Sequence, residues 1–164
     1  MNPRMFLTLG IMPALHLLPS KMDTEDAAAL MLAIALQETG LNARRQIDNH
    51  DGLDNEPARS MFQFELGGVN GVLKHPASRE LAQQLLASMA YADRSPAQLL
   101  VAMEFDQVLA ATFARLALLR DPAPLPHRGD PQAGWLYYLR IWAPDMPREA
   151  EWSENWARAW AALG

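Results

Sequence analysis

The chain has 164 residues, 50% of them hydrophobic, and a formal net charge of −5. This length supports one buried core but is short for two, and the acidic balance argues against nucleic acid as the main partner, because phosphate binding needs a basic surface. The absence of cysteine excludes disulfides, thiolate catalysis and cysteine-ligated metals.

Segment 1–23 places an apolar run after an arginine, as a signal peptide does. Pro13 and His16 interrupt the run, and no small-x-small cleavage site comes after it. We therefore predict a first helix of the core rather than a signal peptide. No stretch has the length and apolar character of a membrane span, so none is expected.

A central helix is predicted next. Thr24 or Asp23 can cap its start, acids in its first turn complement the helix dipole, and Gly40 supplies a left-handed stop. Every residue from 27 to 36 is apolar. A helix that is apolar on all sides is enclosed by other elements, so this one should be buried.

The segment 42–59, NARRQIDNHDGLDNEPAR, is polar and rich in turn residues. A long irregular loop inside a compact domain is often functional. The stretch SMFQFE after it is the candidate for extended structure. A small β-hairpin is therefore predicted near residues 55–65.

Three further helices are predicted. Residues 76–91 have a helical pattern, and Ser95-Pro96 reads as the start of one long helix through 97–119. Asp130-Pro131 repeats this start signal for the next helix, which prolines end.

The last predicted helix carries Trp152, Trp156 and Trp160 at a spacing of four. This spacing forms a stripe on one helix face, and core packing explains such a stripe better than a ligand platform. Together these elements predict a mainly α fold, organised as a single domain over residues 1–164 around a central buried helix.

Glu38 stands in the last turn of the central helix. At the mouth of a cleft its carboxyl would be desolvated, which raises the pKa and keeps a proton for a leaving oxygen. The alternative is a solvated glutamate at a frayed helix end. The helix by itself favours the solvated glutamate. The residues after the polar loop favour the desolvated carboxyl that can donate a proton.

Two motifs carry a family resemblance. LQETGLN ends the predicted buried helix, and PARSMFQFE comes directly after the polar loop. In this order they resemble the goose-type lysozyme and soluble lytic transglycosylase superfamily. The wider arrangement from Met22 to Pro147, with GGVNGVLKHPAS and YYLRIWAPDMP, is similar to small lysozyme-like proteins of tailed phages and prophages.

The resemblance implies a lysozyme-like helical fold with a glycan groove, and Glu38 as the catalytic acid and base. In such transglycosylases one glutamic acid protonates the oxygen between N-acetylmuramic acid and N-acetylglucosamine. It then accepts the proton of the muramic 6-hydroxyl as a 1,6-anhydro ring closes. No cofactor is implied. The expected partners are peptidoglycan glycan strands and other phage virion proteins, and the expected location is a virion or the host cell envelope.

The resemblance also implies substrate-binding residues. Gln63 matches the motif glutamine beside the acid. Phe62 would supply an apolar wall, although packing is the favoured role for this side chain. Tyr137 or Tyr138 would orient the glutamate through a hydroxyl, and Tyr137 is preferred, although the family's Tyr-Asn-Ala-Gly string is absent. Glu65 would line the same groove.

A hydrolase would need a second carboxylate or a positioned water. The candidates are Asp48, Asp51, Asp54 and Glu65. The three aspartates are more typical of solvated turns, and the alternative for Glu65 is a cap on the next segment. Transglycosylation is therefore favoured.

Ser60 and Pro57 stand where the family has glycine, and Thr39 replaces a serine. Glycine lets backbone and sugar approach closely, so these changes bear on the shape of the groove. They motivate a rival from another class, a structural virion protein with the lysozyme-like shape but without efficient catalysis.

No metal site is predicted. The four histidines are scattered without the spacing of a zinc site, and the acids of DNHDGLDNE do not fall on the alternating positions of an EF-hand loop.

Overall fold

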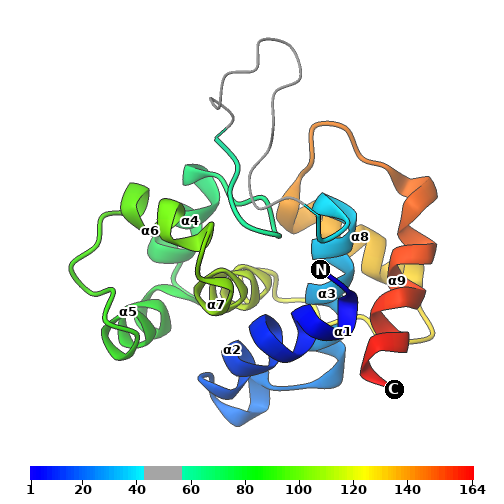
Figure 1. Cartoon of the computed structure of the whole chain (residues 1–164), viewed down its shortest axis with the longest axis horizontal. Coiled ribbons are helices and arrows are strands. Elements are labelled where there is room, and N and C mark those ends of the chain that lie inside the picture. Colours follow the sequence, from blue (N-terminus) through cyan, green and yellow to red (C-terminus); the bar gives the residue numbers. More distant parts are fainter. Residues whose placement is uncertain (43–56) are drawn as a thin grey trace.

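The structure is a computed structural model that describes residues 1–42 and 57–164. Within these two ranges it contains helices and no strand, which confirms the predicted mainly α fold. Figure 1 shows the arrangement. The elements in chain order are α1 (Pro3–Phe6), η1 (Leu7–Ile11), α2 (Met12–His16), η2 (Ser20–Met22), α3 (Glu25–Thr39), α4 (Leu66–Lys74), α5 (Arg79–Ser88), α6 (Pro96–Met103), α7 (Gln107–Leu118), α8 (Pro131–Trp142) and α9 (Glu149–Leu163).

The N-terminal segment is a helix of the core, as predicted. α1, η1 and α2 succeed one another without a gap, and Phe6, Ile11 and Leu15 are completely buried. η1 is a π-type turn that lies just before Pro13. Proline cannot donate a backbone hydrogen bond, and wider turns of this kind accommodate such interruptions.

α3 is the central helix, and both predicted caps are confirmed. The Thr24 hydroxyl accepts a hydrogen bond from the Ala27 N–H at 3.2 Å, and Gly40 ends the helix at a φ of 58°. All residues from Ala27 to Gln37 are buried, because α3 packs against η1, α7 and α9. Alanines on α3 let these neighbours approach closely.

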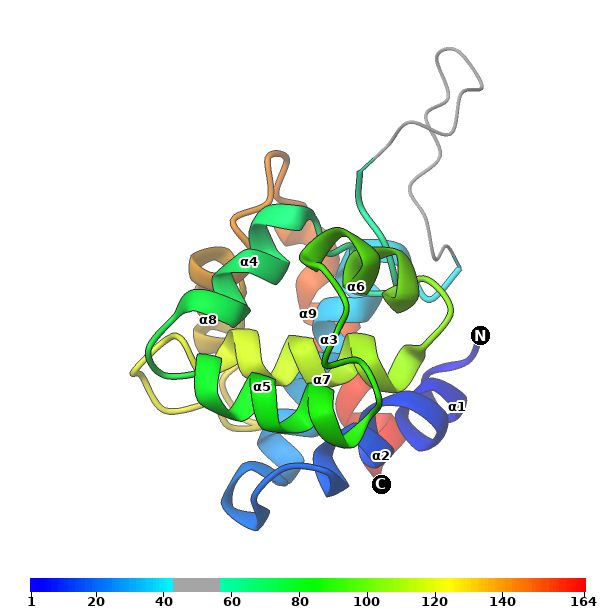
Figure 2. The ribbon, with the colours of Figure 1, turned by 90° about the vertical axis from the view of Figure 1, so that its left-hand side faces the viewer.

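The predicted long helix over 97–119 is wrong, because it is two helices. Ser95 caps α6 as predicted, but α6 ends at Met103 and α7 begins at Gln107. Asp106 caps the new helix by accepting the Leu109 N–H at 2.9 Å, and its other oxygen accepts the hydroxyl of Tyr91 at 3.0 Å. In Figure 2, α4, α5 and α6 lie in front of α7, against which α4 and α6 pack.

The C-terminal helices also agree with the sequence pattern. Asp130 caps α8 by accepting the Ala133 N–H at 2.8 Å. The tryptophans at 152, 156 and 160 are buried in the core, which confirms packing as their role. Gly134 of α8 lies so close to Trp156 that a Cβ there would stand 2.6 Å from Cζ3 of the ring.

The predicted hairpin near 55–65 is reduced to one bridged turn in the part of it that is described. Arg59 and Phe64 exchange two backbone hydrogen bonds of 2.8 Å each, as an isolated antiparallel bridge. Between them Ser60 and Gln63 have positive φ angles of 70° and 51°. Such a tight turn leaves no room for a second bridge inside it.

The hydrophobic core takes buried side chains from each of the helical elements named above. No helix in residues 1–42 or 57–164 combines the length and the apolar character that crossing a bilayer requires.

Candidate active site

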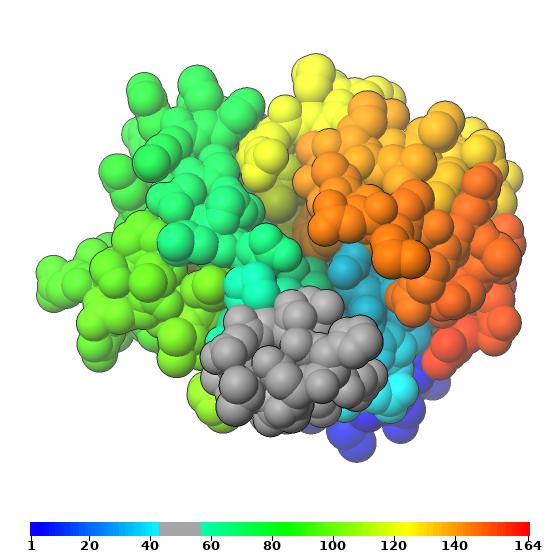
Figure 3. Space-filling view, turned by 90° about the horizontal axis from the view of Figure 1, so that it is seen from above, coloured from blue at the N-terminus to red at the C-terminus, as the bar shows by residue number. Residues whose placement is uncertain are grey.

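A groove of about 610 Å³ lies at the C-terminal end of α3. Figure 3 shows the surface hollowed between the segment that leads into α4, in green, and the segment after α8, in orange. Glu38 lines the groove from the end of α3. The other lining residues are Ala58, Gln63, Phe64, Glu65, Gly67, Gly68, Ala117, Arg120, Ile141, Trp142, Ala143, Pro144, Asp145 and Met146.

The carboxyl of Glu38 is partly buried and hydrogen-bonded. The hydroxyl of Tyr138 donates to its Oε1 at 2.6 Å. Burial raises the pKa of Glu38 above the ordinary value of 4.5, while the Tyr138 hydrogen bond and the charge of Arg148 lower it and offset part of that rise. A buried, hydrogen-bonded carboxyl does not fit the alternative of a solvated helix end, and it holds a proton to higher pH than an exposed glutamate does.

Tyr138 is held rigidly as a donor. Its ring stacks on Trp152 with a centroid distance of 5.3 Å and an interplanar angle of 16°, and Trp135 packs beside it. Burial, and after it the negative charge of Glu38, raises the pKa of the Tyr138 hydroxyl far above its usual value. The hydroxyl therefore remains protonated and donates to the acid throughout the physiological pH range.

The preference for Tyr137 as the partner of Glu38 is wrong. The Tyr137 hydroxyl donates to the carbonyl of Leu118 at 2.7 Å, at the end of α7. Successive residues on a helix point about 100° apart, so only one of two adjacent tyrosines can face α3. As α8 packs in this structure, Tyr138 is the tyrosine that faces Glu38.

The turn 57–65 is tied both to the acid's helix and to α8. The Thr39 hydroxyl at the end of α3 lies in donating distance of the carbonyls of Ala35, at 3.0 Å, and Met61, at 3.2 Å, and the Trp142 indole of α8 donates to the carbonyl of Phe62 at 2.9 Å. Gln63 lines the groove, and its amide donates to the Ser60 carbonyl at 2.8 Å. The turn therefore presents Gln63 on the same groove as Glu38.

Phe62 does not contribute to the groove, so the prediction that it contacts substrate is wrong. Its side chain is 0% exposed and packs against Phe6, Phe64 and Trp142. Because Arg59 and Phe64 pair and close the turn, the Phe62 ring points inward, and packing is its role.

Ser60 keeps the backbone conformation that glycine favours. Its φ of 70° is in the left-handed region, and its hydroxyl accepts the Phe62 N–H at 3.2 Å. The hydroxyl therefore stabilises the turn that a motif glycine would permit. Pro57 is exposed at the start of the described segment.

Glu65 lines the groove and stands at the N-cap position of α4. Within the described part of the chain its side chain makes no capping hydrogen bond, so the alternative of a side-chain cap is not supported. Its position keeps it as the candidate second carboxylate. Asp48, Asp51 and Asp54 lie outside the described residues. Asp145, on the other wall, was missed, since nothing marked the proline-rich segment after α8 as a wall.

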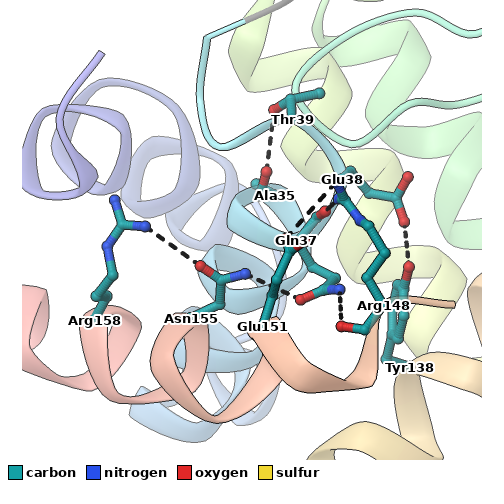
Figure 4. A network of polar contacts seen from close by, with 9 residues as sticks. All are labelled: Ala35, Gln37, Glu38, Thr39, Tyr138, Arg148, Glu151, Asn155 and Arg158. Carbon is teal, nitrogen blue, oxygen red and sulfur yellow. Dashed lines mark hydrogen bonds and ion pairs between the residues drawn. The ribbon is translucent and has the colours of Figure 1, made fainter.

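Directly before the acid lies a buried polar network that the sequence did not reveal (Figure 4). The side-chain amide of Gln37 donates to the backbone carbonyl of Arg148 at 2.9 Å and accepts from the amide of Asn155 at 3.0 Å. The guanidinium of Arg148 donates to the backbone carbonyl of Gln37. The one signal in the sequence is a glutamine that ends an apolar run.

The described residues contain no grouping of three or more histidine, aspartate or glutamate side chains that could hold a metal ion. The groove is instead lined by the carboxyls of Glu38, Glu65 and Asp145 and by the guanidinium of Arg120. These residues supply a proton donor and hydrogen-bonding groups.

Comparison of the chain with protein-family models, curated protein sequences and solved structures found no match. The groove chemistry and the two sequence motifs are therefore what supports a function.

Proposed function

We propose that this protein is a peptidoglycan lytic transglycosylase, which cleaves the β-1,4 bond between N-acetylmuramic acid and N-acetylglucosamine with Glu38 as its acid and base. The observation that carries the proposal is a partly buried carboxyl of raised pKa, held by Tyr138, on an open groove. The groove volume of about 610 Å³ is in the usual range for ligand sites. The substrate class comes from the motif resemblance.

In the proposed first step, protonated Glu38 donates its proton to the glycosidic oxygen as the bond from that oxygen to C1 of the muramic residue breaks. In the second step, the Glu38 carboxylate accepts the proton of the muramic 6-hydroxyl, whose oxygen bonds to C1 and closes the 1,6-anhydro ring. Water is not consumed, and the acid returns to its starting state. The Tyr138 hydrogen bond stabilises the carboxylate between the two transfers.

The rest of the groove offers contacts for sugar rings. Gln63 brings an amide for N-acetyl or hydroxyl groups. Gly67 faces open space, since a Cβ there would meet nothing within 4 Å, so a ligand can approach the backbone of α4 closely.

A hydrolytic lysozyme is the second candidate, and the position of Glu65 favours it. A carboxylate on the same groove as the acid could activate water, as an inverting mechanism requires, or act as a nucleophile. The chemical ends of the released products separate the two reactions, because hydrolysis leaves reducing ends in place of anhydro ends.

Clearing of purified peptidoglycan by the wild type and by Glu38→Gln tests the proposal. We expect clearing by the wild type, none by the folded variant, and anhydro-muropeptides by mass spectrometry. Equal clearing by both proteins would remove Glu38 from the mechanism, and reducing ends alone would identify a hydrolase. A folded wild type that clears nothing would support the non-catalytic virion protein.

We further propose that the protein belongs to a phage particle and opens the host wall locally during genome entry. Its partners are then glycan strands and other virion proteins. Mass spectrometry of purified particles should detect it at a fixed number per particle, and its absence from particles would contradict this setting.

A further inference from the structure

The polar network around Gln37 is unusual because of where it lies. Gln37 lies in the last turn of α3, directly after ten buried apolar residues, and the next residue is Glu38. Both ends of its side-chain amide have partners, as does its backbone carbonyl. A buried polar side chain costs free energy unless its groups are hydrogen-bonded, and an apolar side chain would fill the same space without needing partners. Packing alone therefore does not explain the network.

Arg148 holds Gln37 twice. Its backbone carbonyl accepts from the Gln37 amide, and its guanidinium donates to the Gln37 carbonyl, as Figure 4 shows. The two residues are 111 positions apart in the sequence. Asn155 of α9 fixes the other side of the amide. We call these hydrogen bonds among Gln37, Arg148 and Asn155 the clamp. The clamp joins the last turn of α3 to α9 and to the residue before it.

The clamp also determines where one wall of the groove stands. Residues Ala143, Pro144, Asp145 and Met146 line the groove, and Arg148 ends the segment that contains them. Most of this segment is exposed: Ala143, Asp145 and Pro147 are exposed, and so is Met146, at 85%. Fastening Arg148 to Gln37 therefore sets the distance between this wall and the acid.

Arg148 brings a positive charge to the acid as well. That charge favours the ionised form of Glu38 and so lowers a pKa that burial raises. The other charged groups at the groove are Glu65 at the start of α4, Arg120 after α7 and Asp145 after α8. Glu151 of α9 faces the guanidinium of Arg148 at 3.7 Å.

We propose that Arg148 is a positioning residue, which fastens the groove wall to the acid's helix through Gln37 and holds a positive charge beside Glu38. In the reaction this charge stabilises the carboxylate that exists between the two proton transfers. The catalytic part of the inference rests on the proposed function, but the effect of Arg148 on the acid does not.

Titration of the Glu38 side-chain carboxyl by carbon NMR tests the charge directly, with Glu38→Gln to assign the signal. Arg148→Gln removes the charge but keeps the backbone carbonyl that accepts from Gln37, so the pKa of Glu38 should rise. Arg148→Lys keeps the charge and should restore it. Arg158→Gln is the matched control, because it removes a cation of the same network whose hydrogen bond, within the described residues, goes to Asn155 at 3.4 Å, and it should leave the pKa unchanged.

An unchanged pKa in folded Arg148→Gln would overturn the charge part of the proposal. If that variant did not fold, salt provides the second measurement on the wild type. Arg148 is half exposed, so salt screens its charge and should raise the pKa of Glu38. No response to salt would likewise overturn it.

Peptidoglycan clearing as a function of pH tests the role in the reaction. Arg148→Gln should lose about tenfold or more in rate, because the wall is no longer fixed, and the alkaline limb of its pH profile should move to higher pH. A loss of rate without any movement of that limb would reduce Arg148 to a structural residue. The pKa of Glu38 could differ between the wild type and Arg148→Gln while the wild type clears no peptidoglycan. That result would refute the proposed function and leave the link between Arg148 and Glu38 intact.

Discussion

Replacing Glu38 by glutamine should stabilise the protein at neutral pH, although it removes the proposed catalytic acid. Burial raises the pKa of folded Glu38 above the ordinary 4.5, which the unfolded chain keeps. Between these two values the folded state binds more protons than the unfolded state, so the free energy of unfolding falls as the pH rises. The stability that protonated Glu38 contributes is complete below pH 4.5 and is lost as the pH passes through its folded pKa.

The size of this effect has an upper limit. One proton bound only by the folded state changes the free energy of unfolding by at most about 1.4 kcal/mol per pH unit. Glutamine is uncharged and keeps an oxygen at the position that accepts the Tyr138 hydroxyl, so that hydrogen bond can remain. The other titrating groups are common to both proteins, and their effects cancel in the difference between wild type and variant.

Urea unfolding of both proteins at several pH values between about 4 and 8 measures this difference. The advantage of Glu38→Gln should be smallest at the acid end and grow with pH to a plateau. Glu65→Gln is the control, since it removes a carboxyl from the same groove at an exposed position. A difference that does not change with pH, or a wild type that becomes the more stable protein at neutral pH, would refute the reasoning.

Substitutions at three other positions test separate parts of the site and fold. Tyr138→Phe should raise the pKa of the acid, because the hydroxyl's hydrogen bond lowers it, and the alkaline limb of activity should move to higher pH. Gly134→Ala should cost about 1–3 kcal/mol in urea unfolding, because its Cβ would stand 2.6 Å from the Trp156 ring. Ser60→Gly should stay within about 1 kcal/mol of wild type in thermal unfolding, since glycine relieves the left-handed φ but loses a hydrogen bond, whereas Ser60→Val should cost about 1–3 kcal/mol.

Local signals predicted most of the fold. The caps at Thr24, Ser95 and Asp130 depend on side chains that bond to the backbone three residues away, so the sequence around them is sufficient. The break before α7 was missed because Asp106 lies inside an apolar pattern that suits one helix. Its capping bond to the Leu109 N–H is local too, but the Tyr91 hydroxyl that binds its other oxygen comes from a residue distant in sequence.

The site was only partly predictable for the same reason. Glu38 and Gln63 were identified from their motifs, and both line the groove. The choice between Tyr137 and Tyr138 depends on how α8 packs, which adjacent residues of one type cannot reveal. The inward position of Phe62 depends on the pairing that closes its turn.

The enclosure of α3 has a consequence for how the molecule exchanges its amide hydrogens. Backbone amides in the buried part of this helix, Ala27 to Gln37, should meet solvent when α7, α9 and the N-terminal run separate from it. Their deuterium uptake should therefore be governed by global unfolding, while amides of the turn 57–65 exchange through smaller openings. Glu38 is thus attached to the last part of the protein to open, and local fluctuations of the walls leave its backbone in place.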